Sequence, residues 1–207
     1  MRPLPRVHAI TDADVLALPD LGARAAAILS LGPAVALHVR DRAATTADLA
    51  AAAARFEALA RPPEAAVFVN GRADLAQALG AQGLQLGEHD IAIADARRIF
   101  PRGWIGRSVH SLPAAEQAIA DGADYLMVGS VFDTGTHPGR APAGVELVRR
   151  VAALGRPVIA IGGITVERAA EVRAAGAWGV AAIRALWHAA DPAAAARALA
   201  GPWLEAA

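Results

Sequence analysis

The stretch PVIAIGGITVERAAEVRAAGA (residues 157–177) joins two structural patterns through a pair of glycines. Residues 157–161 form a short apolar run rich in branched side chains, which is typical of a buried strand. From Val166 onward, apolar residues recur at helical spacing. Gly162 and Gly163 lie between the two, and a glycine turn before a helix brings backbone N–H groups to a helix N-terminus, where anions bind. The stretch therefore predicts a strand–helix unit with an anion site at its turn.

The same strand-then-helix pattern recurs along the whole chain. Strands are expected near residues 6–10, 34–39, 66–70, 83–86, 104–108, 124–128, 157–161 and 178–183, and helices include 45–60, 72–81, 112–121, 144–154 and 166–175. Repeated units of this kind place parallel strands side by side with right-handed crossovers. Eight units predict an α/β fold, a single (β/α)₈ TIM barrel occupying residues 1–207 as one domain. The glycine turn follows the seventh strand and not the first, which disfavours a doubly wound dinucleotide fold.

Composition excludes several function classes. The chain has 207 residues, with 20 basic and 20 acidic side chains, so a broad nucleic-acid or membrane-surface footprint is not expected. It has no cysteine, which excludes disulfides, thiolate nucleophiles and cysteine zinc sites. No apolar run reaches the roughly 18 residues of a membrane span. The sequence also shows no signal peptide, so a cytoplasmic protein without nucleic-acid or membrane partners is expected.

Polar residues follow nearly every predicted strand, in the segments HAITD, HVRDR, FVNGR, LGEHD, GRSVHS, GSVFDTGTHPG, AIGGI and AAIRA. In a barrel these carboxyl ends meet at one mouth, which hosts the chemistry. Loops after the last two strands commonly bind phosphate, so Gly162, Gly163, Ala182 and Ile183 are the expected phosphate site, with Arg184 as a charge partner. A tight turn without a ligand remains the alternative for the two glycines.

The loop after the sixth strand carries Thr134, Thr136 and His137, all able to donate or accept hydrogen bonds. A surface turn would explain the glycines and proline beside them, but not two threonines and a histidine at a strand's carboxyl end. We therefore expect these three residues at the mouth.

Several of these segments together resemble the thiamine phosphate synthase/TenI family of barrels. The similar stretches are HAITD, HVRDR, VNGRADLAQALGAQGLQLGEHD, IGRSVHS, GADYLMVGSVF and AIGGIT, in consistent order from about residue 6 to 184. The resemblance implies an enzyme of thiamin biosynthesis or salvage that acts on a thiazole phosphate. A homodimer is left open.

The synthase branch of this family joins a thiazole phosphate to hydroxymethylpyrimidine diphosphate and releases pyrophosphate with the help of Mg²⁺. The resemblance implies that Arg40 and Ser108 meet the diphosphate, that Asn70 lies beside it, and that Asp90 is a Mg²⁺ ligand. Departures from the synthase pattern weaken the synthase assignment. Gly71 stands where the family has its second metal-binding aspartate, and His38 stands where it has a second-strand glutamine. Arg42 and His137 replace its two lysines. Glu88 or His89 could assist Asp90.

The TenI branch is favoured on these departures. Its tautomerases move a proton on a thiazole carboxylate phosphate and need an acid and a base, with no metal cofactor. The histidine that they carry before V-F is Ser130 here, so the candidates for proton transfer are His38, His110 and His137. His137 or His38 is preferred, because each is expected where a strand meets its loop. The sequence prediction is thus a TenI-type thiazole tautomerase; the alternatives are the Mg²⁺-dependent synthase and a non-catalytic thiazole-phosphate-binding module.

Overall fold

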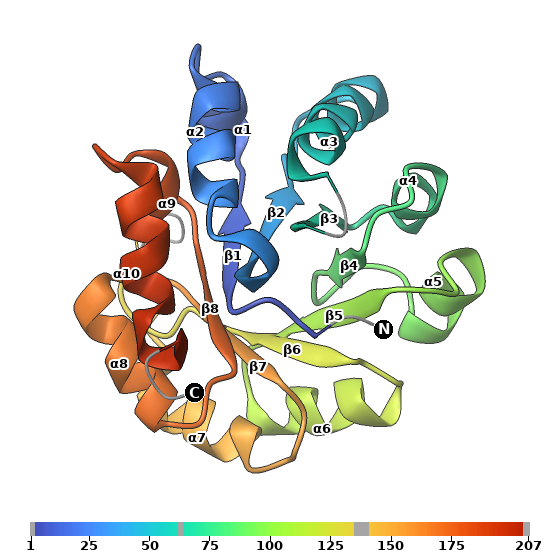
Figure 1. Ribbon diagram of the computed structural model, residues 1–207. Helices are drawn as coiled ribbons and strands as arrows, with labels where there is room; N and C mark the ends of the chain where they lie inside the picture. The colour runs from blue at the N-terminus through green and yellow to red at the C-terminus, as the bar shows by residue number, and fades with distance from the viewer. Residues whose placement is uncertain (1–2, 62–63, 135–140, 205–207) are drawn as a thin grey trace.

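Eight parallel strands pair in sequence order, and the last pairs with the first to close a barrel (Figure 1). The structure is a computed structural model that describes residues 3–61, 64–134 and 141–204. The strands are β1 (Val7–Ile10), β2 (Val35–Val39), β3 (Ala66–Asn70), β4 (Gly83–Leu86), β5 (Trp104–Val109), β6 (Tyr125–Val128), β7 (Val158–Ile161) and β8 (Gly179–Ala182). The predicted (β/α)₈ barrel is confirmed, because each apolar run became one strand.

Helices surround the barrel, as Figure 1 shows. They are α1 (Ala13–Leu16), α2 (Leu21–Leu29), α3 (Thr46–Ala60), α4 (Ala73–Ala78), α5 (Ile93–Ile99), α6 (Leu112–Ala120), α7 (Gly144–Ala152), α8 (Val166–Ala174), α9 (Arg184–Trp187) and α10 (Pro192–Leu204), with a short 3₁₀ turn at Gly32–Ala34. Helix α10 contacts both α2 and α8, and so covers the place where the barrel closes. Within the described residues, no helix has both the length and the apolar character that crossing a bilayer requires.

Side chains at the mouth fix where several helices begin. Asp12 accepts a hydrogen bond from the Val15 N–H at the start of α1, and Ser111 and Thr165 cap α6 and α8 in the same way. Caps of this type stabilise a helix by about 1 kcal/mol. Each cap follows a strand directly or after a short loop, so the mouth loops are short and their positions are well defined.

Large aromatic rings fill the barrel interior where a neighbouring strand carries glycine. Phe68 on β3 pairs in register with Gly83 on β4, and Tyr125 on β6 pairs with Gly106 on β5. A β-carbon on either glycine would overlap the ring of its partner. Both rings are fully buried, so they close the barrel interior below the carboxyl ends of the strands.

Candidate active site

A cavity of about 1090 Å³ opens at the carboxyl ends of the strands. The predicted site residues that line it are Arg40, Asn70, Asp90, Ser108, His110, Thr134, Gly162, Gly163, Ala182 and Ile183. Thr136 and His137 lie outside the described residues. The strand ends therefore converge as the barrel geometry requires, and the polar residues that follow them share one cavity.

The glycine turn after β7 packs closely against the loop after β6. Gly162 and Gly163 have φ of +99° and +63°, in the region that favours glycine. A β-carbon on Gly162 would lie 2.7 Å from the Cα of Ser130. The turn leads into α8, and the backbone around Ile183, at the start of α9, lines the same cavity. Close packing thus requires the glycines, and residues just before α8 and just before α9 both line the cavity.

Arg168, on the first turn of α8, is a cation at this turn that sequence reasoning missed. Its Nη1 donates to the carbonyl oxygen of Gly163 at 2.7 Å, and its guanidinium carbon lies 4.5 Å from the centre of the Phe132 ring. The side chain lines the cavity. A positive charge held beside a glycine turn favours an anion there. Helical spacing alone gave no sign of this contact, because its partner is a backbone carbonyl.

The backbone of Arg40 is held at the mouth by the side chain of Thr11. The buried Thr11 hydroxyl accepts from the Arg40 N–H at 2.8 Å and donates to the Arg40 carbonyl at 2.9 Å. Burial lowers the pKa of Arg40, and the neighbouring Arg42 lowers it further. Among the described residues, Arg40, Arg42 and Arg184 form no ion pair although all three line the cavity. Arg40 is partly buried, whereas Arg42 and Arg184 are exposed. Guanidinium groups without an ion-pair partner at a cavity attract an anionic ligand.

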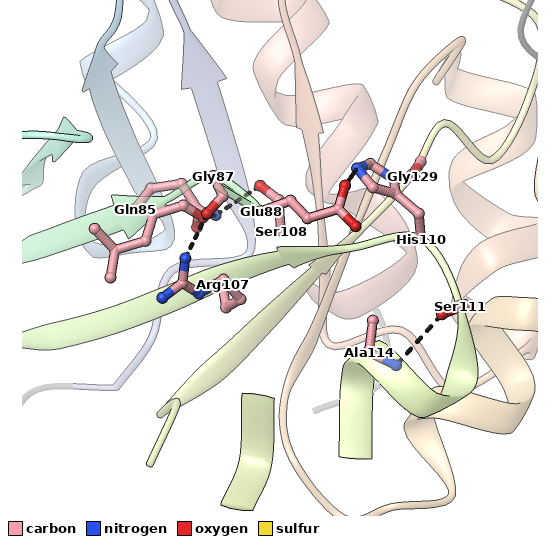
Figure 2. Close-up of polar contacts among 10 residues, drawn as sticks. Gln85, Gly87, Glu88, Arg107, Ser108, His110, Ser111, Ala114 and Gly129 are labelled. Carbon is pink, nitrogen blue, oxygen red and sulfur yellow. Dashed lines mark hydrogen bonds and ion pairs between the residues drawn. The ribbon is translucent and has the colours of Figure 1, made fainter. Parts of the chain in front are cut away.

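Ser108 is oriented by a buried glutamine, as Figure 2 shows. The Nε2 of Gln85 on β4 donates to Ser108 Oγ at 3.1 Å and to the Leu86 carbonyl at 2.9 Å. Because Ser108 accepts this bond, its own proton is available to a ligand in the cavity. Gln85 was not singled out in the sequence, since its place in an apolar strand resembles any buried position.

His110 is anchored to the backbone of the next strand. Its Nδ1 donates to the Gly129 carbonyl oxygen, and its Nε2 lies 3.7 Å from the carboxylate of Glu88 (Figure 2). Both Glu88 and His110 line the cavity. The ring is therefore fixed with Nε2 facing a carboxylate, which accounts for its position without a proton-transfer role.

The position expected for His38 is corrected by the structure. His38 lies within β2 and has 0% exposure, so it does not stand where a strand meets its loop. Burial lowers the pKa of its imidazole to about 4. His38 is not among the residues that line the cavity. The structure thus corrects the expected position of His38, and its part in proton transfer stays a prediction.

Asp90 sits on the loop between β4 and α5, and this loop is held from β5. Arg107 donates to the carbonyl oxygen of Gly87 at 2.5 Å (Figure 2). It also donates to the carbonyl oxygen of Ile91 at 2.7 Å. Asp90 Oδ2 accepts from the Gly87 N–H at 2.6 Å. Arg107 thus supports the loop and is not among the cavity-lining side chains.

The number of metal-ligating side chains around Asp90 decides what kind of metal site it can form. Within the described residues, no cluster of three or more acidic, histidine or cysteine side chains could hold a metal ion. Mg²⁺ in phosphate-handling sites commonly takes one or two carboxylates and completes its shell with substrate phosphates and water. The single carboxylate of Asp90 fits a Mg²⁺ ion that arrives with a diphosphate, and does not form a complete protein cage.

Comparisons with known proteins show which family this chain resembles. The model of the family described as thiamine monophosphate synthase matches residues 7–186. The thiamine-phosphate synthase of Methanoculleus marisnigri is 42% identical over 177 residues, 84% of each chain. That of Mycolicibacterium gilvum is 50% identical over 144 residues, which are 69% of this chain and 61% of that protein, less than two thirds of its length. A thiamine phosphate pyrophosphorylase structure from Pyrococcus furiosus aligns with a TM-score of 0.81 at 33% identity, over 97% of this chain and 96% of that one.

The Methanoculleus and Mycolicibacterium relatives are named thiamine-phosphate synthases, and they support the synthase alternative better than the tautomerase that the sequence departures favoured. The match runs through all eight strands and through the loops that carry the cavity. The chain therefore belongs to the thiamine monophosphate synthase family.

Proposed function

We propose that this chain is a Mg²⁺-dependent thiamine-phosphate synthase, which joins a thiazole phosphate to hydroxymethylpyrimidine diphosphate and releases pyrophosphate. The observation that carries the proposal is the 42% identity to a thiamine-phosphate synthase over 84% of the length of both chains. The cavity supports it, because a glycine turn with Arg168 and a group of unpaired arginines give it places for two anions.

In this reaction the C–O bond to the diphosphate breaks and its electron pair leaves with pyrophosphate, while the thiazole nitrogen forms the new N–C bond. Arg40 and Arg42 would balance the negative charge of the leaving group, and the Ser108 hydroxyl would donate a hydrogen bond to the departing pyrophosphate. Asp90 would hold Mg²⁺ together with diphosphate oxygens, and the ion supplies further neutralisation of the leaving group when bound. Gly162, Gly163 and Arg168 would bind the phosphate of the thiazole.

The proposal is tested by incubating the purified protein with both substrates, in Mg²⁺ and in a chelator, and following thiamine phosphate by its fluorescence after oxidation. Product that forms only with Mg²⁺ is the expected result. Asp90→Asn should raise the Mg²⁺ concentration needed, whereas Asp95→Asn, on the surface of α5, should not.

Two other outcomes would replace the proposal. Isomerisation of a thiazole carboxylate phosphate without synthase product would establish the tautomerase. Binding of the thiazole phosphate without either reaction would establish a non-catalytic binding module.

A further inference from the structure

A chain of hydrogen bonds crosses the barrel interior beneath the cavity. His8 Nε2 lies 3.2 Å from the carbonyl oxygen of Pro5, and His8 Nδ1 lies 2.7 Å from His38 Nε2. His38 Nδ1 is in turn 3.0 Å from the Oδ1 of Asn70. Both rings have 0% exposure, while Asn70 lines the cavity. The chain therefore connects the closed interior of the barrel to a side chain at the ligand site.

The donors and acceptors along this chain fix one another. The Pro5 carbonyl only accepts, so His8 must donate from Nε2. If both rings are neutral, His8 Nδ1 accepts from His38 Nε2, and His38 Nδ1 is then itself an acceptor. The Asn70 atom that meets it must be the donor Nδ2, which a half-turn of the amide provides. In that arrangement Asn70 Oδ1 points toward the cavity.

One additional proton reverses the last link. When the histidine pair carries one extra proton, that proton is on Nδ1 of His38. The His38 Nδ1–H group then donates a hydrogen bond to Asn70 Oδ1. The Asn70 Nδ2 group then points toward the cavity as a donor. The neutral pair thus offers an acceptor to the ligand, and the protonated pair offers a donor.

The surroundings of the pair favour its neutral form in the free protein. Burial lowers the pKa of both histidines, and the nearby ring of His38 further lowers the pKa of His8. Phe68 and Tyr125 pack against His8, and burial raises the pKa of Tyr125 so that it stays uncharged. The charged group nearest to His38 in the sequence is Arg40, which directly follows the end of β2.

We propose that His8 and His38 are positioning residues for Asn70: when neutral they turn its amide oxygen to the cavity, and a bound diphosphate reverses the amide by bringing one proton onto the pair. Phosphate oxygens only accept hydrogen bonds, so they require the Nδ2 side of Asn70. The inference rests on the proposed function only for the identity of the anion.

The direct test is nitrogen NMR of the histidine rings in the full-length, wild-type protein at neutral pH. In the free protein, both rings should carry their proton on Nε2 with Nδ1 bare. A proton on His38 Nδ1 in the free protein would overturn the proposal. With saturating inorganic pyrophosphate, His38 Nδ1 should gain a proton, and binding that leaves both rings unchanged would also overturn it.

A second test uses the pH dependence of pyrophosphate affinity. Glutamine at position 38 can reverse its own amide without a proton, so His38→Gln should lose the linkage. The ratio of the wild-type pyrophosphate affinity to that of His38→Gln should fall as the pH rises from about 6 to 8, by up to about tenfold per pH unit. Ile159→Val, a buried change on β7 that removes no hydrogen-bonding group, should keep the wild-type slope. Equal slopes in wild type and His38→Gln would contradict the proposal.

Failure of pyrophosphate to bind at all would instead count against the proposed function. The spectrum of the free protein would then still decide the orientation of Asn70, because it requires no ligand.

Discussion

The β-carbon that Gly71 lacks would lie 3.4 Å from the Asp90 Oδ2 atom. A side chain at position 71 would therefore point directly at the carboxylate that we assign to Mg²⁺. The backbone of Gly71 has φ of +72°, and aspartate and asparagine accept this region more readily than other side chains. The position beside Asp90 is thus one where the sequence supplies no second carboxylate.

Gly71→Asp should lower the Mg²⁺ concentration at half-maximal synthase activity by roughly tenfold, because a second carboxylate adds a ligand charge. Gly71→Asn is the matched control, with the same shape and backbone preference but no charge. Activity titrated against Mg²⁺ measures both. An equal effect of the two substitutions would show that charge at this position is not involved.

Arg40→Ala should lower kcat/KM for the pyrimidine diphosphate by roughly a hundredfold, since it removes a partly desolvated cation from the leaving group. Steady-state kinetics with the thiazole phosphate held at saturation measure this. Arg98→Ala, which removes an exposed cation of α5, serves as the control. Unchanged kinetics in Arg40→Ala would remove Arg40 from the diphosphate site.

Arg168→Met should raise KM for the thiazole phosphate by about tenfold and leave KM for the pyrimidine diphosphate near its wild-type value. Methionine keeps much of the side-chain length over Phe132 but cannot donate to the Gly163 carbonyl. The two KM values, measured separately, decide whether the glycine turn serves the thiazole side. A shift in the diphosphate KM alone would reverse the assignment of the two anion sites.

Gly106→Ala should destabilise the fold by about 1–3 kcal/mol, because its methyl group would overlap the Tyr125 ring. Urea unfolding of the single variant measures this cost. In a background that carries Tyr125→Leu the same substitution should cost less, and the double-mutant cycle gives the coupling. Equal costs in both backgrounds would mean that the ring and the glycine are independent.

Glu57 on α3 should make stability fall as the pH rises. Burial raises the pKa of Glu57 from 4.5 to about 7, and its Oε1 is buried without a hydrogen-bond partner among the described residues. Ionisation thus costs the folded state more than the unfolded state, so stability is lost between about pH 4.5 and 7. Glu57→Gln should unfold with the same midpoint as wild type near pH 4, and be about 1 kcal/mol more stable near pH 8 after solvent screening. A constant difference across this range would contradict the assignment.

The sequence predicted the barrel well because each apolar run is short and is bounded by polar residues. The same alternation placed Arg40, Asn70 and Ser108 at strand ends that share a cavity. The sequence pattern did not predict how deep in the barrel each side chain lies. His38 lies within β2 and Arg40 follows the end of the strand two residues later, yet His38 is fully buried and Arg40 lines the cavity. Contacts from side chains to backbone carbonyls, such as that of Arg168, leave no mark in residue spacing.

The preference for the tautomerase branch rested partly on the absence of lysine at two positions, which is a property of the whole chain. Two of the departures were lysines of the synthase branch, replaced by Arg42 and His137. The chain contains no lysine anywhere, since all 20 of its lysine-or-arginine positions are arginine. The absence of lysine at these two positions therefore reflects the composition of the whole chain and does not distinguish one branch from the other.

The pairing of Phe68 with Gly83 and of Tyr125 with Gly106 also bears on how ligands come and go. Because these rings close the barrel beneath the cavity, both substrates and both products of the proposed synthase reaction would pass through the same opening. Whichever molecule lies deeper must arrive first and be released last. An enzyme built in this way is expected to show an ordered kinetic mechanism, in which the deeper product inhibits competitively against the substrate that binds first.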